Sequence, residues 1–388
     1  MTNCVCARGA SIRDHLSGRV DPKFFHGIDD LFLRRIICDQ GCGTSATISQ
    51  RAIKIFSEAH TPAGGTDDGD FRLEVRRVPA TLTAHLPPHP RLRRASAISR
   101  FAAAAGLGAL AEAKTPPSLD RIALVFAISN GGVIYTRRFY ADIVKSGAQS
   151  ASPLLFPETV FNAPASHLAA ILGISGASYT VVGDGAVGIL ALKLAEDLIA
   201  SSDLDACLVV AAEEVDPLVC EAYRQWRFLR DPKKPETGRG MIMSEGAGAV
   251  LLKRSHGGIE IDQIVPGANF FRRSQASARL GSVVSRLKNE IGFCVGSANG
   301  TFIDRAEHAA VGDELPLYSP KIALGESVGA SVFWQLITAA NALETGTLPG
   351  SSKPPVKSRA LVLACGLNQQ TGGLTLRGRD CSAFPGRA

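Results

Sequence analysis

Residues 176–195 have the pattern of a β-strand, a glycine-rich turn and a helix, an arrangement on which enzymes mount nucleophiles. A side chain on such a turn points out of the sheet, where the first amides and the dipole of the helix stabilise an anionic sulfur or oxygen. The turn here is Gly183-Asp184-Gly185, which offers a carboxylate and neither a thiol nor a hydroxyl. Because Asp is a favoured N-cap, we predict that Asp184 accepts backbone N–H groups at the helix start.

Two further polar positions lie downstream, Asn299 in Asn299-Gly300-Thr301 and Glu326 after Lys321. If the fold groups Asn299 and Glu326 with Asp184 in one pocket, the carboxylates supply an acid and a base. The Asn299 amide then supplies a hydrogen-bond donor for an oxyanion. This chemistry suits acyl hydrolysis or acyl transfer and is one alternative function.

The elements that must position these residues follow from hydrophobic patterning. Buried strands are predicted at residues 122–128, 206–212, 246–252 and 360–364, and helices at residues 96–113, 186–200 and 328–345. Their alternation predicts an α/β fold. Residues 1–95 contain Pro- and Gly-rich breaks and predict peripheral strands and loops. We expect a seam between two halves near residues 253–258.

The composition of the chain limits the classes of function that it can have. Of the 388 residues, 45% are hydrophobic and 20% charged, so the chain folds and is long enough for two packed halves. A net charge of +6 is too small for a dedicated nucleic-acid binder. The N-terminus has no secretory pattern, and no apolar run approaches the roughly 20 residues that span a bilayer. We expect a cytoplasmic protein with neither nucleic acid nor a membrane as partner.

The nine cysteines are an odd number, and Cys207 lies in an apolar run. We expect reduced, buried thiols of a cytosolic protein. The pairs Cys4-x-Cys6 and Cys38-x3-Cys42 lack the usual spacing of zinc ligands, so no metal site is expected.

Several segments, taken in order, resemble the β-ketoacyl synthases of the thiolase fold. Residues 176–195 and 205–214 resemble the active-site region of that family. The other matching segments are residues 96–113 (an early helix), 122–140 (a strand and a Gly-Gly turn), 152–162 (the stretch along the dimer interface) and 243–252 (a Gly-rich strand). The resemblance implies an α/β thiolase fold with two similar halves, residues 96–255 and 256–388, in layered αβαβα architecture, after an N-terminal segment of residues 1–95.

The resemblance does not extend to the catalytic residues of the family, which are replaced in this sequence. Its nucleophilic Cys falls on Gly185, its first His on Asn299 and its second His on Glu326, whereas Lys321 and Gly325 persist. The Gly-Phe-Gly gate of the family corresponds loosely to Gly366-Leu367-Asn368. Claisen condensation needs a thiolate to carry the acyl chain and two imidazoles to assist decarboxylation and stabilise the enolate. An ionised Glu326 beside a developing enolate would raise its energy.

The resemblance therefore implies a catalytically inactive subunit similar to a chain-length factor. Such a subunit pairs with an active β-ketoacyl synthase in type II polyketide, polyene or fatty-acid-like assembly and shapes the acyl tunnel. It binds no cofactor itself and acts with a phosphopantetheinylated acyl carrier protein. Many chain-length factors have Gln at the Cys position, so Gly185 favours a polyene-type or fatty-acid-like member. Tunnel or interface candidates are Leu155, Phe156, Val160 and Phe161, with Leu154 beside them. A scaffolding protein without the pocket is the remaining alternative.

Overall fold

The computed structural model describes residues 46–52, 74–79, 83, 86–93, 95–113, 117–232, 238–254, 258–349 and 359–378. The candidate metal pairs Cys4-x-Cys6 and Cys38-x3-Cys42 lie outside these residues. Within them, Cys207, Cys220, Cys294 and Cys365 are buried free thiols. No helix in the described part of the chain is both long and apolar enough to cross a membrane.

The described residues build a ten-stranded sheet in the order β10-β9-β11-β12-β8-β1-β7-β5-β3-β4, beside a two-stranded sheet of β2 and β6. The strands are β1 (Ala46–Ala52), β2 (Val75–Arg76), β3 (Ile122–Ile128), β4 (Ser178–Val182), β5 (Ala206–Glu213), β6 (Met243–Ser244), β7 (Gly246–Lys253), β8 (Glu260–Val265), β9 (Phe293–Val295), β10 (Leu317–Tyr318), β11 (Arg359–Cys365) and β12 (Thr371–Arg377).

The large sheet has two halves with the same strand order. In one half β3 pairs in parallel with β4 and β5, and the antiparallel strands β7 and β1 follow. In the other half β9 pairs in parallel with β10 and β11, and the antiparallel strands β12 and β8 follow. The two similar halves of the predicted α/β fold are therefore confirmed.

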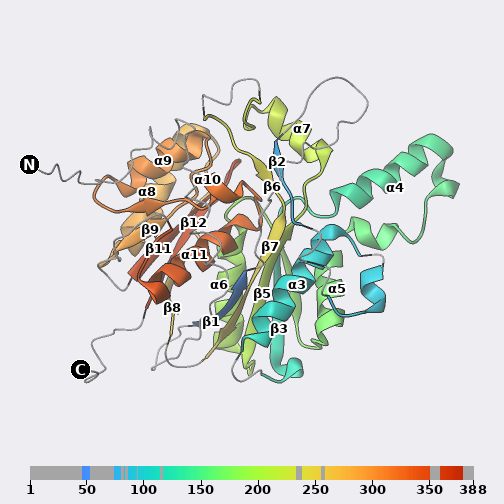
Figure 1. Ribbon diagram of the computed structural model, residues 1–388, viewed down its shortest axis with the longest axis horizontal. Coiled ribbons are helices and arrows are strands. Elements are labelled where there is room, and N and C mark those ends of the chain that lie inside the picture. Colours follow the sequence, from blue (N-terminus) through green and yellow to red (C-terminus); the bar gives the residue numbers. More distant parts are fainter. Residues whose placement is uncertain are drawn as a thin grey trace, which may run out of the picture.

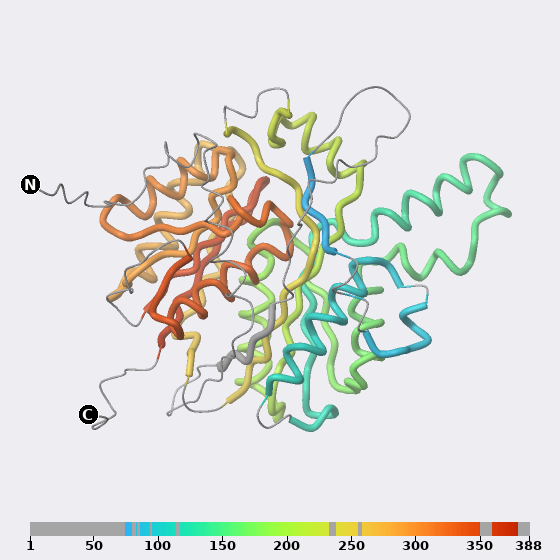
Figure 2. The backbone as a smooth tube through the Cα atoms, viewed as in Figure 1, coloured from blue at the N-terminus to red at the C-terminus, as the bar shows by residue number. Residues whose placement is uncertain are grey.

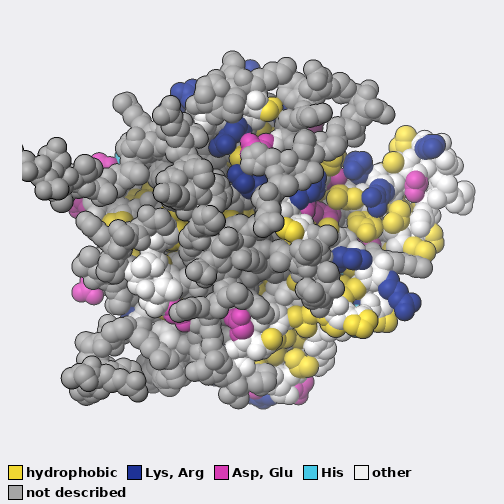
Figure 3. Space-filling view, in the orientation of Figure 1, with side chains coloured by type: hydrophobic (Ala, Val, Ile, Leu, Met, Phe, Trp, Pro, Cys, Tyr) yellow, Lys and Arg dark blue, Asp and Glu magenta, His cyan; other side chains and the backbone are white. Residues whose placement is uncertain are grey.

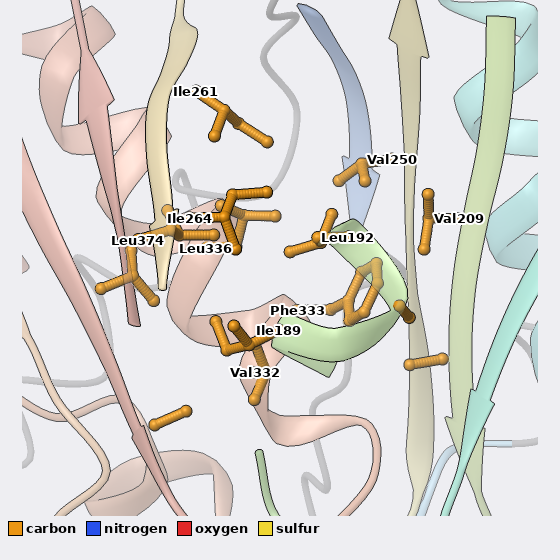
Figure 4. Close-up of a cluster of buried hydrophobic side chains, with 14 of the residues drawn as sticks. Ile189, Leu192, Val209, Val250, Ile261, Ile264, Val332, Phe333, Leu336 and Leu374 are labelled. Carbon is orange, nitrogen blue, oxygen red and sulfur yellow. The ribbon is translucent and has the colours of Figure 1, made fainter. Parts of the chain in front are cut away.

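Helices form layers on and between these halves (Figure 1). They are α3 (Ala97–Ala111), α4 (Val133–Ser146), α5 (Ala163–Leu172), α6 (Val187–Ser201), α7 (Pro217–Gln225), α8 (Ala276–Leu287), α9 (Phe302–Val311), α10 (Lys321–Leu324) and α11 (Ser331–Thr345). Helices α6 and α11 lie in the central layer. Their residues Ile189 and Phe333 lie between Val209 of one half and Leu374 of the other, in one buried hydrophobic cluster (Figure 4). Helices α3 and α5 cover the outer face of the first half, and α8 packs on the outer face of the second.

Burial explains why the strands could be predicted from sequence. Every residue of β3 and β5 is buried, because α6 covers one face of both strands, while α5 covers β3 and α3 covers β5 on the other face. Strands covered on both faces are continuously apolar, which is the pattern that the sequence shows. The predicted bounds of these strands, and of β7 and β11, agree with the structure to within one residue.

Two expectations need correction. Helix α11 begins at Ser331 and not at residue 328, because Val328 has a φ of 44°, outside the helical region. Strand β1 is not peripheral: it lies between β7 and β8 and joins the two halves of the sheet. The polar sequence of β1 carries no mark of this central position.

One part of the chain projects from the layered body. After β3 the chain forms α4, turns through the 3-10 helices η6 (Ala148–Ser150) and η7 (Phe156–Thr159), and returns to α5. Figure 2 follows this path out and back. We call residues 133–162 the arm. No residue of α4 is fully buried, and the helix packs mainly on η6 and η7 of the arm itself and not on the layered body.

Candidate functional site

The turn between β4 and α6 places Gly185 directly before the helix. Helix α6 begins at Val187, and its N-cap Ala186 has no capping side chain. A Cβ atom added to Gly185 would lie 3.0 Å from the Gly366 Cα, tighter than an ordinary van der Waals contact. The loop after β11 therefore closes over Gly185, the position that the sequence resemblance assigns to the nucleophile.

Asp184 holds this loop in place. Its Oδ1 accepts from the backbone N–H of Leu367 (3.2 Å), and its Oδ2 accepts from those of Asn368 (2.8 Å) and Gln369 (3.0 Å). The predicted role of Asp184 as the N-cap of α6 is therefore wrong. The carboxylate does accept backbone N–H groups, but they belong to a loop far along the sequence, which the folded sheet brings next to the turn.

Asn299 and Glu326 lie side by side in the interior. The Asn299 amide Nδ2 donates to Glu326 Oε2 over 2.7 Å, and Lys321 Nζ donates to the same oxygen over 2.9 Å. Both side chains of the Lys321–Glu326 ion pair are at most 2% exposed. We call Asn299, Lys321 and Glu326 the polar triad. The sequence indicated only the negative charge of Glu326, and the structure shows that Lys321 supplies its counter-charge.

The second oxygen of Glu326 is also occupied. Glu326 Oε1 accepts from the backbone N–H of Val328 over 2.9 Å and from the Ser331 hydroxyl over 2.8 Å. These two bonds tie the carboxylate to the start of α11. With both oxygens engaged twice, Glu326 is a satisfied buried acceptor and has no free position for a substrate proton.

Two carboxylates of α9 organise the backbone around Asn299. Glu307 accepts from the N–H groups of Ser297 (2.6 Å) and Ala298 (3.0 Å), and Asp304 accepts from those of Asn299 (2.8 Å) and Gly300 (3.0 Å). Burial raises the pKa of Glu307 to about 7 and raises the pKa of Asp304, while these N–H groups oppose both shifts. The loop amides thus point at protein carboxylates and not into a substrate space.

Tyr223 of α7 belongs to the same interior, and sequence reasoning missed it. Burial raises its pKa, and the neighbouring carboxylates of Asp184, Glu213 and Glu326 raise it further. Its ring packs at 6.2 Å between centroids from Phe228. No motif marks residue 223, because its position depends on how α7 folds back over the ends of the strands.

The three residues of the hydrolase alternative are thus only partly brought together. Asn299 and Glu326 are hydrogen-bonded, whereas the Asp184 carboxylate binds the loop of residues 367–369. A cavity of about 280 Å³ opens beside this loop, lined by Ala186, Gln370 and Thr371 among others. In the described part of the chain, no three His, Cys, Asp or Glu side chains are grouped to hold a metal ion.

The tunnel or interface candidates lie on the arm, away from the polar triad. Leu154, Phe156, Val160 and Phe161 are exposed, between 40% and 62% of each residue, and Leu155 is half-buried. Hydrophobic and basic side chains gather on this projection at the right of Figure 3. A groove of about 610 Å³ runs along α4, lined by Val133, Tyr140, Val144, Phe161 and Leu218 among others.

Internal contacts fix the shape of the arm. Phe156 packs against Phe139 with ring centroids 5.7 Å apart. His167 Nε2 of α5 lies 2.6 Å from Glu158 Oε1 of η7, and both side chains are largely buried. This pair gives His167 a structural role in holding η7 against α5. The exposed apolar residues are therefore presented by an ordered surface.

Comparisons with known proteins agree with this architecture. Residues 44–257, more than half of the chain, match the N-terminal domain of the β-ketoacyl synthases. Among solved structures, the chain is similar to the ishigamide ketosynthase/chain length factor, with a TM-score of 0.66 and 19% identity over 79% of this chain and 87% of that one.

Two further solved structures have the same fold. A β-ketoacyl synthase from Burkholderia phymatum STM815 has a TM-score of 0.66 and 17% identity over 79% of this chain and 88% of that one. A type II polyketide synthase acyl-carrier protein in complex with its ketosynthase bound to the hexaketide gives a TM-score of 0.68 and 15% identity over 89% of this chain and 100% of that one. With its matching domain and its two-halved layered sheet, the chain belongs to the β-ketoacyl synthase family.

Proposed function

We propose that this protein is a non-catalytic β-ketoacyl synthase subunit, similar to a chain-length factor. It pairs with an active β-ketoacyl synthase in the cytoplasm and contributes to type II polyketide, polyene or fatty-acid-like chain assembly. A solved relative of the same fold carries the description ketosynthase/chain length factor, which supports this class of role. The subunit binds no cofactor of its own and works on chains carried by a phosphopantetheinylated acyl carrier protein. A relative solved with an acyl-carrier protein supports this partner.

The observation that carries the proposal is the state of the three family catalytic positions. Gly185 has no side chain to acylate and faces Gly366 at close range. Asn299 and Glu326 stand where the family has its histidines; Asn299 donates to Glu326, and Glu326 is also paired with Lys321. Without a nucleophile or an imidazole, the site supplies neither an acyl-enzyme nor stabilisation of an enolate.

The arm supports the choice of a protein partner. Val144 is 86% exposed and Tyr140 is 59% exposed, although both are apolar enough to favour a core or an interface. Strand β4 lies at the edge of the large sheet, and its Tyr179 and Val182 are also exposed. A ketosynthase docked on the arm would cover this apolar surface, as obligate interfaces do.

The first experiment tests the chemistry. The purified chain is incubated with malonyl-loaded and acyl-loaded carrier protein, and its intact mass and products are measured. We expect no ketoacyl product and no covalent acyl adduct. Stoichiometric acylation of the isolated chain would contradict the proposal.

The second experiment tests the partnership. The chain is co-expressed with a catalytic ketosynthase from the same source, and the complex is isolated through a tag on one subunit. We expect a stable heterodimer that condenses acyl chains. A chain that behaves as a monomer and ignores the co-expressed ketosynthase would argue for the scaffolding alternative.

A further inference from the structure

The loop between β11 and β12 presents three consecutive backbone N–H groups to one carboxylate. The donors are Leu367, Asn368 and Gln369, and the acceptor is Asp184, which is only 7% exposed. Successive N–H groups that converge on one point form a concave anion-binding site. Here the anion is part of the protein itself.

The contact is reciprocal. The Gln370 side-chain Oε1 accepts from the Asp184 backbone N–H over 2.7 Å, and the backbone N–H of Gly366 donates to the Gln370 carbonyl over 2.7 Å. The turn therefore binds the loop through the Asp184 side chain, and the loop binds the turn through the Gln370 side chain. Both partners are fixed at the place where Gly366 closes over Gly185.

Two glycines make this approach possible. A Cβ atom on Gly366 would overlap the Asp184 carboxylate, and a Cβ atom on Gly183 would lie 2.8 Å from the Gln370 side chain. Neither glycine has a positive φ, so the close approach, and not the backbone conformation, explains these residues. The carboxylate fills the space above the loop amides and leaves no room for another anion.

We propose that residues 366–370 form a carboxylate-binding loop that Asp184 occupies from within, and that this internal ligand latches the loop shut over Gly185. The site accepts one small monocarboxylate in place of the Asp184 side chain. This inference concerns the loop and its ligand, and it holds whether or not the chain pairs with a ketosynthase.

The experiment is chemical rescue of stability in the full chain. Asp184→Ala removes the carboxylate and takes the acceptor from three N–H groups, of which that of the buried Leu367 is the costliest to leave unpaired, and this lowers the melting temperature. Sodium formate then fits beside the alanine methyl, and sodium acetate fits in Asp184→Gly, where its methyl replaces the missing Cβ. At ten times the dissociation constant of the bound anion, the unfolding equilibrium constant falls about elevenfold.

Controls separate binding from a general salt effect. Sodium chloride at the same ionic strength should rescue neither variant, and formate should not stabilise Asp197→Ala, which lacks an exposed carboxylate of α6, the helix that follows the turn. If chloride matches formate and acetate, or if neither anion rescues its variant, the proposal is wrong.

A second measurement applies if those variants do not fold. Hydrogen exchange of the amides of residues 367–369 is compared between the native chain and Asp184→Asn. The Asn side chain keeps one acceptor oxygen but turns an N–H₂ donor towards the remaining amides, so at least one of them should exchange about tenfold faster. Exchange in β11 serves as the internal reference. Unchanged exchange throughout the loop would overturn the latch.

Discussion

At the residue scale, the polar triad is a buried, hydrogen-bonded cluster of an amide, an ammonium and a carboxylate. Under the proposed function, Asn299 and Glu326 stand at the two histidine positions of the family, and each donates to or accepts from a buried neighbour. A buried ion pair loses hydration, so its net contribution to stability is small when both partners are present. Removal of one partner is costly because the other charge stays buried and uncompensated.

This asymmetry predicts the behaviour of the Lys321–Glu326 pair. Glu326→Gln should lower the free energy of unfolding by about 3–5 kcal/mol, since it leaves the Lys321 ammonium without a counter-charge. Adding Lys321→Met to that variant should recover part of the loss. Urea unfolding of the native chain, both single variants and the double variant gives the coupling energy. Additive losses would show that the two charges do not depend on each other.

A second prediction concerns the nucleophile position. Gly185→Cys should give neither condensation nor acylation, because its Cβ meets Gly366 and neither Asn299 nor Glu326 supplies an imidazole to assist the thiol. Glu326 is paired with Lys321, so its charge is compensated and does not itself prevent the new thiol from reacting. The obstacles are the steric crowding by Gly366 and the lack of an imidazole at residues 299 and 326. Intact-mass measurement after incubation with acyl-loaded carrier protein tests this. Acylation of the variant at a rate near that of a catalytic ketosynthase would refute it.

A third prediction gives the pH dependence of stability. Burial raises the pKa of Glu213 to about 8, against the opposing N–H groups of Ser129 and Asn130, with a further rise from Glu214. The folded state therefore holds a proton at Glu213 that the unfolded state releases between pH ~4.5 and ~8. In this window the stabilisation falls as pH rises, by up to about 1.4 kcal/mol per pH unit for one group.

The variant Glu213→Gln isolates that contribution, because its carbonyl oxygen can still accept from the two N–H groups. Urea unfolding at pH 5, 6, 7 and 8 should give a shallower fall in the free energy of unfolding than in the native chain. Glu221→Gln is the matched control, since the Arg224 side chain lowers the pKa of Glu221 to about 2, below the window. Equal slopes in the native chain and Glu213→Gln would contradict the assignment.

At the scale of elements, the arm combines an ordered backbone with an exposed apolar surface. The Glu158–His167 pair and the Phe139–Phe156 contact hold η7 against α5 and α4. Phe161 packs over Gly131, where a Cβ would lie 2.6 Å from its ring. Such a surface can serve as the core of an interface or as the end wall of a partner's acyl tunnel.

Alanine substitutions distinguish these two roles. If the arm ends the tunnel, Phe156→Ala and Phe161→Ala should shift the partner's product towards longer chains without abolishing turnover, because removed volume admits further methylenes. If the residues only form interface core, the complex should dissociate or yield less product of unchanged length. Mass spectrometry of products from complexes shown to be intact separates the outcomes. Unchanged length in both variants would rule out the tunnel-end role.

At the scale of the whole molecule, sequence patterns predicted the strands whose residues are buried on both faces. Strands such as β3 and β5 are apolar throughout because helices cover both faces, and their bounds could be predicted. The central position of β1 in the sheet could not be predicted, because it depends on pairing with β7 and β8, which lie far along the chain. The same holds for Asp184, whose three donors lie more than 180 residues away in sequence.

The exposed apolar arm leads to a prediction about assembly. The triple variant Tyr140→Ser, Val144→Ser and Leu154→Ser should leave the melting temperature of the isolated chain nearly unchanged, because these residues are more than half exposed and bury little in the free subunit. It should lose the ketosynthase in co-purification, since their apolar area would be buried only in the complex. Phe271→Ser is the matched control, because Phe271 is 83% exposed but follows β8 in the other half of the molecule. A triple variant that still co-purifies in full, or a control that loses the partner equally, would place the interface elsewhere.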